Sequence, residues 1–388
     1  MRFFIVVLLS VLSGFSQTVI NHSCRALTQI PLAWIDSAKT KLHIAYGHTS
    51  HGSQLTTGMT GLVGFINGNG LGLDYSENVF AWNTGGTNGA LDLRDGAMAG
   101  DVGYYPQWVE NTTAYLGTPN SSGRGSSHPD VNVIIWSWCG QVSTKYADET
   151  LASEYLVPMD SLENLYPGIV FVYMTGHLNH WADSDTKGGN QMIRDYCNTN
   201  QKVLYDFADI ESYDPDGNFY EFASDDCSYY AGSSGSYIGN WAQTWQNSHT
   251  EEVDWYTCSS AHSEPLNANL KAYAAWWLWA TLAGWDGATA IDKTDEAKKD
   301  LSTLSLHFSP NPFNPKVKIM VCGKLETGSI LEIYEMAGKR IQTMTLSEHS
   351  LSADRSLVWN GANHPSGLYL VRIISGNKAA SKQMTLLK

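Results

Sequence analysis

Two serines and two histidines lie within six residues of each other near the start of the chain: His48, Ser50, His51 and Ser53. They follow a short β-type run that stops at Gly47. A sharp strand-to-helix turn is where many hydrolases hold a hydroxyl nucleophile clear of a sheet. A neighbouring imidazole activates such a hydroxyl by taking its proton. The segment therefore predicts a serine hydrolase, with Ser50 as the nucleophile and Ser53 as its competitor.

Other segments with polar and small residues follow later β-type runs, which suggests that one sheet edge gathers them all. The predicted strands are residues 42–46, 131–136, 169–174 and 203–206. Helical patterns between and after them include residues 187–198 and 264–283. Alternating strands and helices predict an α/β fold with a doubly wound parallel sheet. In such sheets ligands bind beyond the carboxyl ends of the strands.

The order of these segments resembles the SGNH (GDSL-like) hydrolase family, a flavodoxin-like three-layer sandwich. The resemblance covers residues 17–288 and implies hydrolysis of ester bonds without a cofactor. Carried over by position, Ser50 is the nucleophile, His262 the general base and Asp254 the residue that orients it. Gly140 and Gln141 fall in the block that forms the oxyanion hole.

Three departures from the family pattern concern the same residues. The family's Gly-Asp-Ser is replaced by Gly47-His48-Thr49-Ser50, and its Asn by Gln141. Asp254 precedes His262 by eight residues, whereas the family spacing is three. The second oxyanion glycine is either Gly100 or Gly103.

Two further interpretations of the sequence stay open, one from the remaining histidines and one from the aromatic residues. His48, His51 and His177 are expected to line the site as substrate contacts. Together with His180, His262 and Asp183 they could instead bind zinc or another divalent ion and support metal-assisted hydrolysis. The many aromatic residues, together with the export signal described next, would also suit a non-catalytic carbohydrate-binding protein.

The N-terminus has the features of an export signal. Arg2 is followed by an apolar stretch at residues 3–12 and by small residues before a cleavage point near Gln17. We therefore expect a signal peptide at residues 1–16. A polar linker at residues 289–304 then separates the hydrolase domain, residues 17–288, from short alternating strands at residues 305–388, which predict an Ig-like β-sandwich.

The C-terminal segment resembles the type IX secretion sorting domain of Bacteroidota. The matching residues are Ser309–Pro315, Ile333–Lys339, Trp359–Gly361, Ser366–Val371 and the final Lys388. The resemblance implies that the type IX secretion machinery carries the protein to the cell surface or beyond.

Composition limits the partners further. The chain has 388 residues, of which 43% are hydrophobic, and its net charge is −14. Such a charge argues against binding to nucleic acid or to an anionic membrane. No stretch after the leader is long enough to span a bilayer. Of six cysteines, Cys227 and Cys258 form the best candidate for a disulfide. An ester of a small molecule or a polysaccharide, including an O-acetylated carbohydrate, is the expected substrate.

Overall fold

The structure is a computed structural model that describes residues 18–75, 78–287, 305–309, 313–322, 325–326, 328–335, 339–346, 356–376 and 378–388. The predicted leader at residues 1–16 and linker at residues 289–304 lie outside these residues. The described residues form two compact units, one before residue 289 and one after it.

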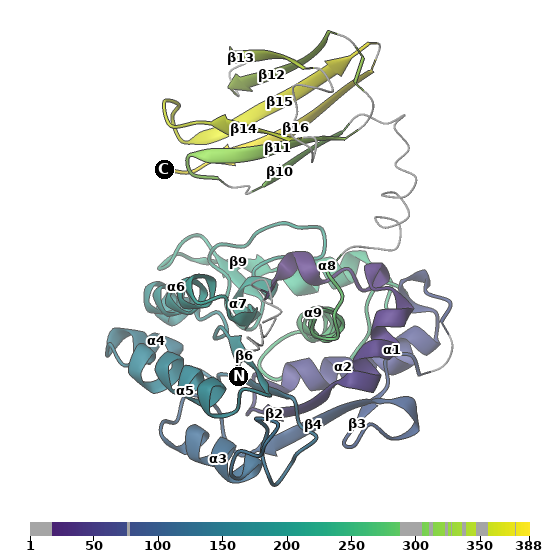
Figure 1. The fold of residues 1–388 in the computed structure, drawn as a ribbon, viewed down its shortest axis with the longest axis vertical. Helices are drawn as coiled ribbons and strands as arrows, with labels where there is room; N and C mark the ends of the chain where they lie inside the picture. Colours follow the sequence, from purple (N-terminus) through teal and green to yellow (C-terminus); the bar gives the residue numbers. More distant parts are fainter. Residues whose placement is uncertain are drawn as a thin grey trace, which may run out of the picture. The chain divides into compact units, whose positions relative to one another are not determined.

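The first unit is built on a seven-stranded sheet in which every pairing is parallel (Figure 1). Its strands are β1 (Thr18–Ile20), β2 (His43–Gly47), β3 (Trp82–Asn83), β4 (Leu91–Met98), β5 (Val133–Trp136), β6 (Val170–Met174) and β7 (Val203–Tyr205). The strand order is β1-β7-β6-β5-β2-β4-β3. Without the edge strands β1 and β3 this is the 2-1-3-4-5 order of flavodoxin-like sheets. The predicted α/β class with a parallel sheet is confirmed.

Helices cover both faces of this sheet, because its strands are apolar on both sides. Along β2, Ile44 and Tyr46 join one hydrophobic core, and Ala45 between them joins the other. The first core lies under α1 (Leu32–Lys41), α2 (Ser53–Asn67) and α9 (Pro265–Leu282). The second lies under α3 (Gln107–Leu116), α5 (Val157–Leu165) and α6 (Asp183–Thr199). Shorter elements complete the unit: α4 (Val142–Ala147), α7 (Phe207–Ile210), α8 (Trp241–Ser248) and the hairpin of β8 (Ser228–Tyr230) and β9 (Tyr237–Asn240).

The long apolar helix predicted near residues 264–283 is α9, and it is buried almost all round. Figure 1 shows it end-on between α1, α2 and α8. It packs closely on α2, where a Cβ added at Gly58 would lie 2.1 Å from the carbonyl oxygen of Ala268. The helix ends before Gly284, whose φ of +114° only glycine adopts readily. Among the described residues no helix has both the length and the apolar composition needed to cross a bilayer.

The second unit is made of two antiparallel sheets that share one hydrophobic core. One sheet contains β10 (Ser305–Ser309), β11 (Lys316–Cys322) and β14 (Ser356–Asn360). The other contains β12 (Ser329–Glu335), β13 (Arg340–Leu346), β15 (Gly367–Ser375) and β16 (Lys378–Leu386). Trp359 and Tyr369 pack edge to face within the core, 5.5 Å apart between ring centroids. This antiparallel β unit agrees with the short alternating strands expected from the sequence.

The expected disulfide between Cys227 and Cys258 is not formed, since both thiols are free. The Cys227 sulfur lies 3.3 Å from the Ser263 hydroxyl. The Cys258 thiol donates to the carbonyl of Pro265 at 3.8 Å. Each sulfur therefore has a hydrogen-bond partner near the start of α9, and in the part of the chain that the structure describes neither is bonded to another sulfur.

Candidate functional site

The loops that follow β2, β5 and β6 meet beyond the carboxyl ends of these strands. They carry His51, Cys139 and His177, respectively. The chain enters α2 on one face of the sheet after β2, and α4 on the other face after β5. The two loops therefore diverge at the topological switch point, where a doubly wound sheet forms its binding crevice. Two later loops add Asp225 and His262 to the same place.

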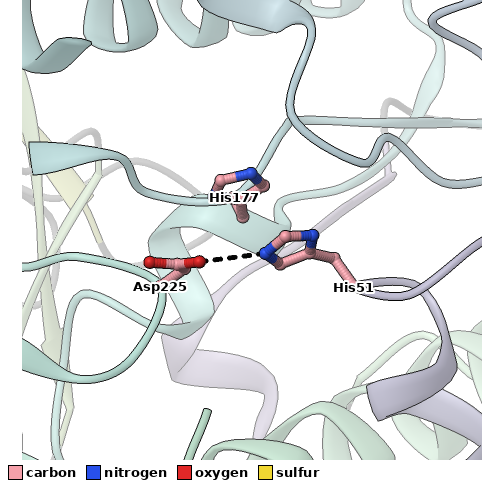
Figure 2. A group of neighbouring side chains, drawn as sticks. All are labelled: His51, His177 and Asp225. Carbon is pink, nitrogen blue, oxygen red and sulfur yellow. Dashed lines mark hydrogen bonds and ion pairs between the residues drawn. The ribbon is translucent and has the colours of Figure 1, made fainter. Parts of the chain in front are cut away.

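His51 is the centre of this group and has a partner on each ring nitrogen. Its Nε2 lies 3.0 Å from Oδ2 of Asp225, and a dashed line joins the two side chains in Figure 2. Its Nδ1 lies 3.5 Å from the sulfur of Cys139. An ionised carboxylate can only accept a hydrogen bond, so Asp225 favours the tautomer protonated on Nε2. The Nδ1 lone pair is then free to accept the thiol proton of Cys139.

The charges of the pair follow from burial and hydrogen bonding. Burial lowers the pKa of His51 below its ordinary value, although the bond to Asp225 opposes this. Burial alone would raise the pKa of Asp225, but the hydrogen bonds from His51 and Ser224 and the nearby His177 lower it to about 2. Both pKa values are therefore lowered, whereas an ion pair would raise the pKa of the imidazole and lower that of the carboxyl group. They agree with a charged carboxylate that accepts a hydrogen bond from a neutral imidazole at neutral pH.

Two other imidazoles stack on His51. The ring of His177 lies 3.8 Å away and nearly parallel, at 6°. The ring of His262 lies 4.5 Å away at 21°. His177 Nδ1 lies 2.6 Å from the carbonyl oxygen of Leu178, so this nitrogen carries the proton and donates it. His262 has a φ of +62°, a left-handed conformation that is uncommon for a residue with a side chain.

Backbone amides beside Cys139 face a side chain of the same loop. The N–H groups of Cys139 and Gly140 donate to Oε1 of Gln141 at 3.2 and 3.1 Å. Cys139 is half-buried and Gly140 is exposed. These residues and His177 line a small cavity of about 10 Å³, room for roughly one water molecule.

A buried ion pair below the site connects the loops that carry the three histidines. Nζ of Lys271, on α9, donates to Glu211 at 2.6 Å and also to Gln54. The other oxygen of Glu211 accepts the N–H of Leu178, next to His177. The amide of Gln54, three residues after His51, donates to the carbonyl of Ala261, next to His262. The pair is fully buried, and burial lowers the pKa of Lys271.

The structure brings His51, His177, His262, Gly140 and Gln141 together, as the sequence suggested. Ser50 is exposed, and within the described part of the chain its hydroxyl makes no hydrogen bond. Its carbonyl oxygen accepts the hydroxyl of Ser53 at 2.7 Å. Among the described residues, neither serine hydroxyl is therefore hydrogen-bonded to an imidazole.

Asp254 and His48 have partners of their own elsewhere. The Asp254 carboxylate accepts the N–H of Thr250 at 2.8 Å within a tight turn. It lines a separate cavity with Trp245 and Tyr273. His48 Nε2 lies 2.6 Å from Asp95. Burial lowers the pKa of His48, but the hydrogen bonds to Asp95 and to the carbonyl of Thr49, together with the charge of Asp95, raise it above its ordinary value.

The site contains two residues to which sequence reasoning gave no role, Cys139 and Asp225. Cys139 stands in the Trp-Cys-Gly-Gln segment after a central strand, and this position was a usable signal. Asp225 lies in a long irregular segment between α7 and β8, where no pattern marked it.

Comparison with known proteins assigns the C-terminal unit. Residues 308–386 match the family model described as "Secretion system C-terminal sorting domain". The protein is exported to the cell surface or beyond. The sorting domain makes the type IX secretion machinery its partner in export. No curated protein matches the chain.

Solved structures resemble the chain only weakly. Dimeric latent PorU from Porphyromonas gingivalis is 20% identical over 21% of this chain, with a TM-score of 0.18, and the chain covers 9% of PorU. An immunoglobulin-like DUF3244 protein from Bacteroides vulgatus is 14% identical over 22% of this chain and 94% of its own, with a TM-score of 0.17. A Cellulomonas fimi endo-beta-1,4-mannanase double mutant is 12% identical over 96% of this chain and 100% of its own, with a TM-score of 0.23. Scores this low carry no argument about fold or activity.

Proposed function

We propose that the protein is an exported hydrolase of ester bonds whose nucleophile is Cys139. The observation that carries this proposal is the chain of contacts from the Cys139 sulfur to His51 Nδ1 and from His51 Nε2 to Asp225. A nucleophile, a base and a group that orients the base make up the triad arrangement of acyl-transfer enzymes. The thiol–imidazole distance of 3.5 Å is within the looser range of sites without substrate.

The mechanism has two steps. Nδ1 of His51 takes the thiol proton, and the Cys139 sulfur attacks the ester carbon to give a tetrahedral intermediate. The C–O bond then breaks, and the alcohol leaves with the proton held by His51. In the second step His51 deprotonates water, which attacks the thioester and releases the acid and the Cys139 thiol. Asp225 keeps its charge throughout and stabilises the imidazolium in both steps.

The serine mechanism expected from the sequence is the alternative nucleophilic route to the same reaction. It uses Ser50 with His262 as base. The exposed position of Ser50 leaves it accessible to a substrate, but its hydroxyl has no imidazole partner among the described residues. Cys139 has one, and for that reason we favour the thiol.

Metal-assisted hydrolysis is the second candidate. Figure 2 shows the side chains of His51, His177 and Asp225 grouped together, and one donor atom of each lies within 4.8 Å of the others. An imidazole lone pair lies in the plane of its ring, and the two rings are parallel to within 6°. Their lone pairs therefore cannot meet at one ion unless a ring turns. This orientation makes us rank the metal below the thiol.

Exposed aromatic residues beside the site support a carbohydrate ester as the substrate. Trp181 is 83% exposed and Tyr237 is 59% exposed. Tyr230 lies between them, with ring centroids 6.2 Å from Trp181 and 6.0 Å from Tyr237. Trp181 lies four residues after His177, and Tyr230 lies five residues after Asp225. Flat aromatic faces near residues of the site in the chain offer a sugar ring a large apolar contact.

The experiment that tests the proposal measures hydrolysis of an aryl acetate by the purified chain and its variants. We expect Cys139→Ala to abolish turnover, Ser50→Ala and Ser53→Ala to keep it, and EDTA to leave it unchanged. Iodoacetamide should inactivate the wild type by alkylating Cys139. Loss of activity in Ser50→Ala but not in Cys139→Ala would move the nucleophile to Ser50.

Two other outcomes would contradict a nucleophilic mechanism altogether. Activity that EDTA removes and zinc restores would favour the metal. Binding to acetylated polysaccharide with no turnover of any ester would indicate a carbohydrate-binding protein.

A further inference from the structure

Two neighbouring backbone N–H groups point at one oxygen atom beside the Cys139 sulfur. The N–H of Cys139 and the N–H of Gly140 both donate to Oε1 of Gln141, at 3.2 and 3.1 Å. Convergence of two amide donors on a single carbonyl-type oxygen is the geometry that an acyl-transfer enzyme needs around its oxyanion. One of the two donors belongs to the proposed nucleophile itself, which places the polarised oxygen next to the attacking sulfur.

The orientation of the Gln141 amide follows from these two donors. A flipped amide would direct its NH₂ group at two N–H groups, donor against donor, so the side-chain oxygen occupies this position. Gln141 therefore acts here as an acceptor, whereas the family resemblance assigned it to the donor side of the oxyanion hole.

The Gln141 carboxamide occupies the space that a side chain at position 103 would fill, and Gly103 has none. A Cβ added at Gly103 would lie 2.3 Å from Cδ and 2.4 Å from Oε1 of Gln141. Any side chain there would push the carboxamide away from the two amides. The N–H of Gly103 is held by Asp101 at 2.9 Å, so the backbone cannot easily move aside. A second segment of the chain thus allows the contact between Gln141 and the loop after β5.

We propose that the amides of Cys139 and Gly140 form the oxyanion hole and that the Gln141 side-chain oxygen fills it when no substrate is bound. The acyl oxygen of the ester displaces Gln141 as it enters. This inference rests on the proposed thiol mechanism, and it deepens that mechanism by naming the donors and the group that competes for them.

The consequence for catalysis is a competition in the ground state. Each substrate must break the two hydrogen bonds to Gln141 before it makes its own. The Gln141 side chain that occupies the oxyanion hole therefore raises KM. A carboxylate at this position would accept the same two hydrogen bonds more strongly, because charge-assisted bonds are stronger than neutral ones. Removing the carboxamide should ease substrate entry and leave both donors in place.

The test compares Gln141→Ala, Gln141→Glu and Gly103→Ala in hydrolysis of an aryl acetate. We expect KM to fall several-fold in Gln141→Ala and in Gly103→Ala, with kcat not reduced. Gln141→Glu should lower kcat/KM at least tenfold at neutral pH. Gln191→Ala, at an exposed position on α6, is the matched control and should behave as the wild type. A fall of kcat by about 100-fold in Gln141→Ala would overturn the proposal, since that is the effect of removing an oxyanion donor.

Amide hydrogen exchange separates failure of this inference from failure of the proposed function. In Gln141→Ala the amides of Cys139 and Gly140 lose their acceptor, so we expect their exchange to accelerate at least tenfold even if no ester is turned over. Unchanged exchange at both amides would show that Gln141 does not hold them. If exchange accelerates but the protein hydrolyses no ester, Gln141 does occupy the two amides and the proposed hydrolase function is wrong.

Discussion

Nε2 of His51 and Oδ2 of Asp225 lie 3.0 Å apart although 174 residues separate them in the chain. The first residue follows a central strand of the sheet, and the second comes from an irregular loop over the sheet edge. Their hydrogen bond determines which ring nitrogen of His51 faces the Cys139 thiol. The proposed chemistry therefore depends on a long-range contact and not on a local motif.

Replacing Asp225 by Asn should change both the rate and its pH dependence. In the wild type the pKa of His51 is below its ordinary value of about 6.5, so activity should rise with pH below that value as the base becomes neutral. Without the carboxylate the pKa of His51 falls further, which moves this limb to lower pH. Loss of the fixed tautomer should lower kcat by about two to four orders of magnitude.

The measurement is kcat/KM between pH 4 and 8 for Asp225→Asn and for Asp226→Asn, an exposed neighbour that serves as the control.

The Asp225 carboxylate also affects the stability of the fold. Because the folded protein lowers the pKa of Asp225 to about 2, its stabilising contribution is complete above pH 4 and disappears as the pH falls toward 2. Wild type should lose about 2 kcal/mol more than Asp225→Asn over that range. Identical pH profiles of kcat/KM in Asp225→Asn and Asp226→Asn would contradict the role of Asp225.

The central strands and the last helix were predictable because buried elements of this kind consist of continuous apolar runs. β5 and β6 are covered on both faces, so each reads as an uninterrupted series of Val, Ile, Phe and Tyr. Strand β4 was missed because Asp92 and Arg94 interrupt its pattern. The structure compensates this buried charge by pairing Asp92 with Arg94 and with His43, each at 2.9 Å. The edge strands β1 and β3 are too short to give a periodic signal.

The candidate site was predictable as a place but not as a set of contacts. Sheet topology alone brings His51 and His177 to one edge, so their proximity could be expected from the order of strands. The pairing of His51 with Cys139 depends on side-chain directions in two loops. Asp254 was expected to orient His262. Its carboxylate instead accepts the N–H of Thr250 and closes a local turn.

Breaking the buried Lys271–Glu211 pair should destabilise the fold strongly. Lys271→Met would leave the Glu211 carboxylate buried without its cation, which typically costs about 3–5 kcal/mol in the free energy of unfolding. Lys271→Met combined with Glu211→Gln should cost less than Lys271→Met alone, since no uncompensated charge remains. Urea denaturation followed by fluorescence of the buried Trp residues measures both. A single variant as stable as the wild type would mean that the pair is not desolvated in solution.

Two glycines of α2 should respond in opposite directions to substitution by Ala. At Gly58 the new methyl group would meet the carbonyl oxygen of Ala268 at 2.1 Å, so α2 and α9 must separate. We expect Gly58→Ala to destabilise the protein by about 1–3 kcal/mol. At Gly64 nothing lies within 4 Å, and Gly64→Ala should stabilise by about 0.5–1 kcal/mol through helix propensity. Chemical denaturation of the matched pair decides this, and effects of equal sign would contradict the packing described for α2 and α9.

Replacing the exposed Trp181 by Ala should weaken the use of carbohydrate esters more than that of small esters. Its ring is 83% exposed and lies near His180 and Tyr230, at centroid distances of 5.1 and 6.2 Å. An exposed ring adds little to stability, so the free energy of unfolding should change by no more than about 0.5 kcal/mol.

The KM of Trp181→Ala for an acetylated oligosaccharide should rise several-fold, because a sugar ring next to the scissile ester loses its aromatic contact. The KM for an aryl acetate should rise less, because an aryl acetate has no sugar ring to pack on Trp181. Phe219→Ala is the control, since Phe219 is 56% exposed but packs on Tyr213 instead of on the cluster around Tyr230. Equal changes in KM for both substrates, or for both variants, would contradict an aromatic subsite for sugar.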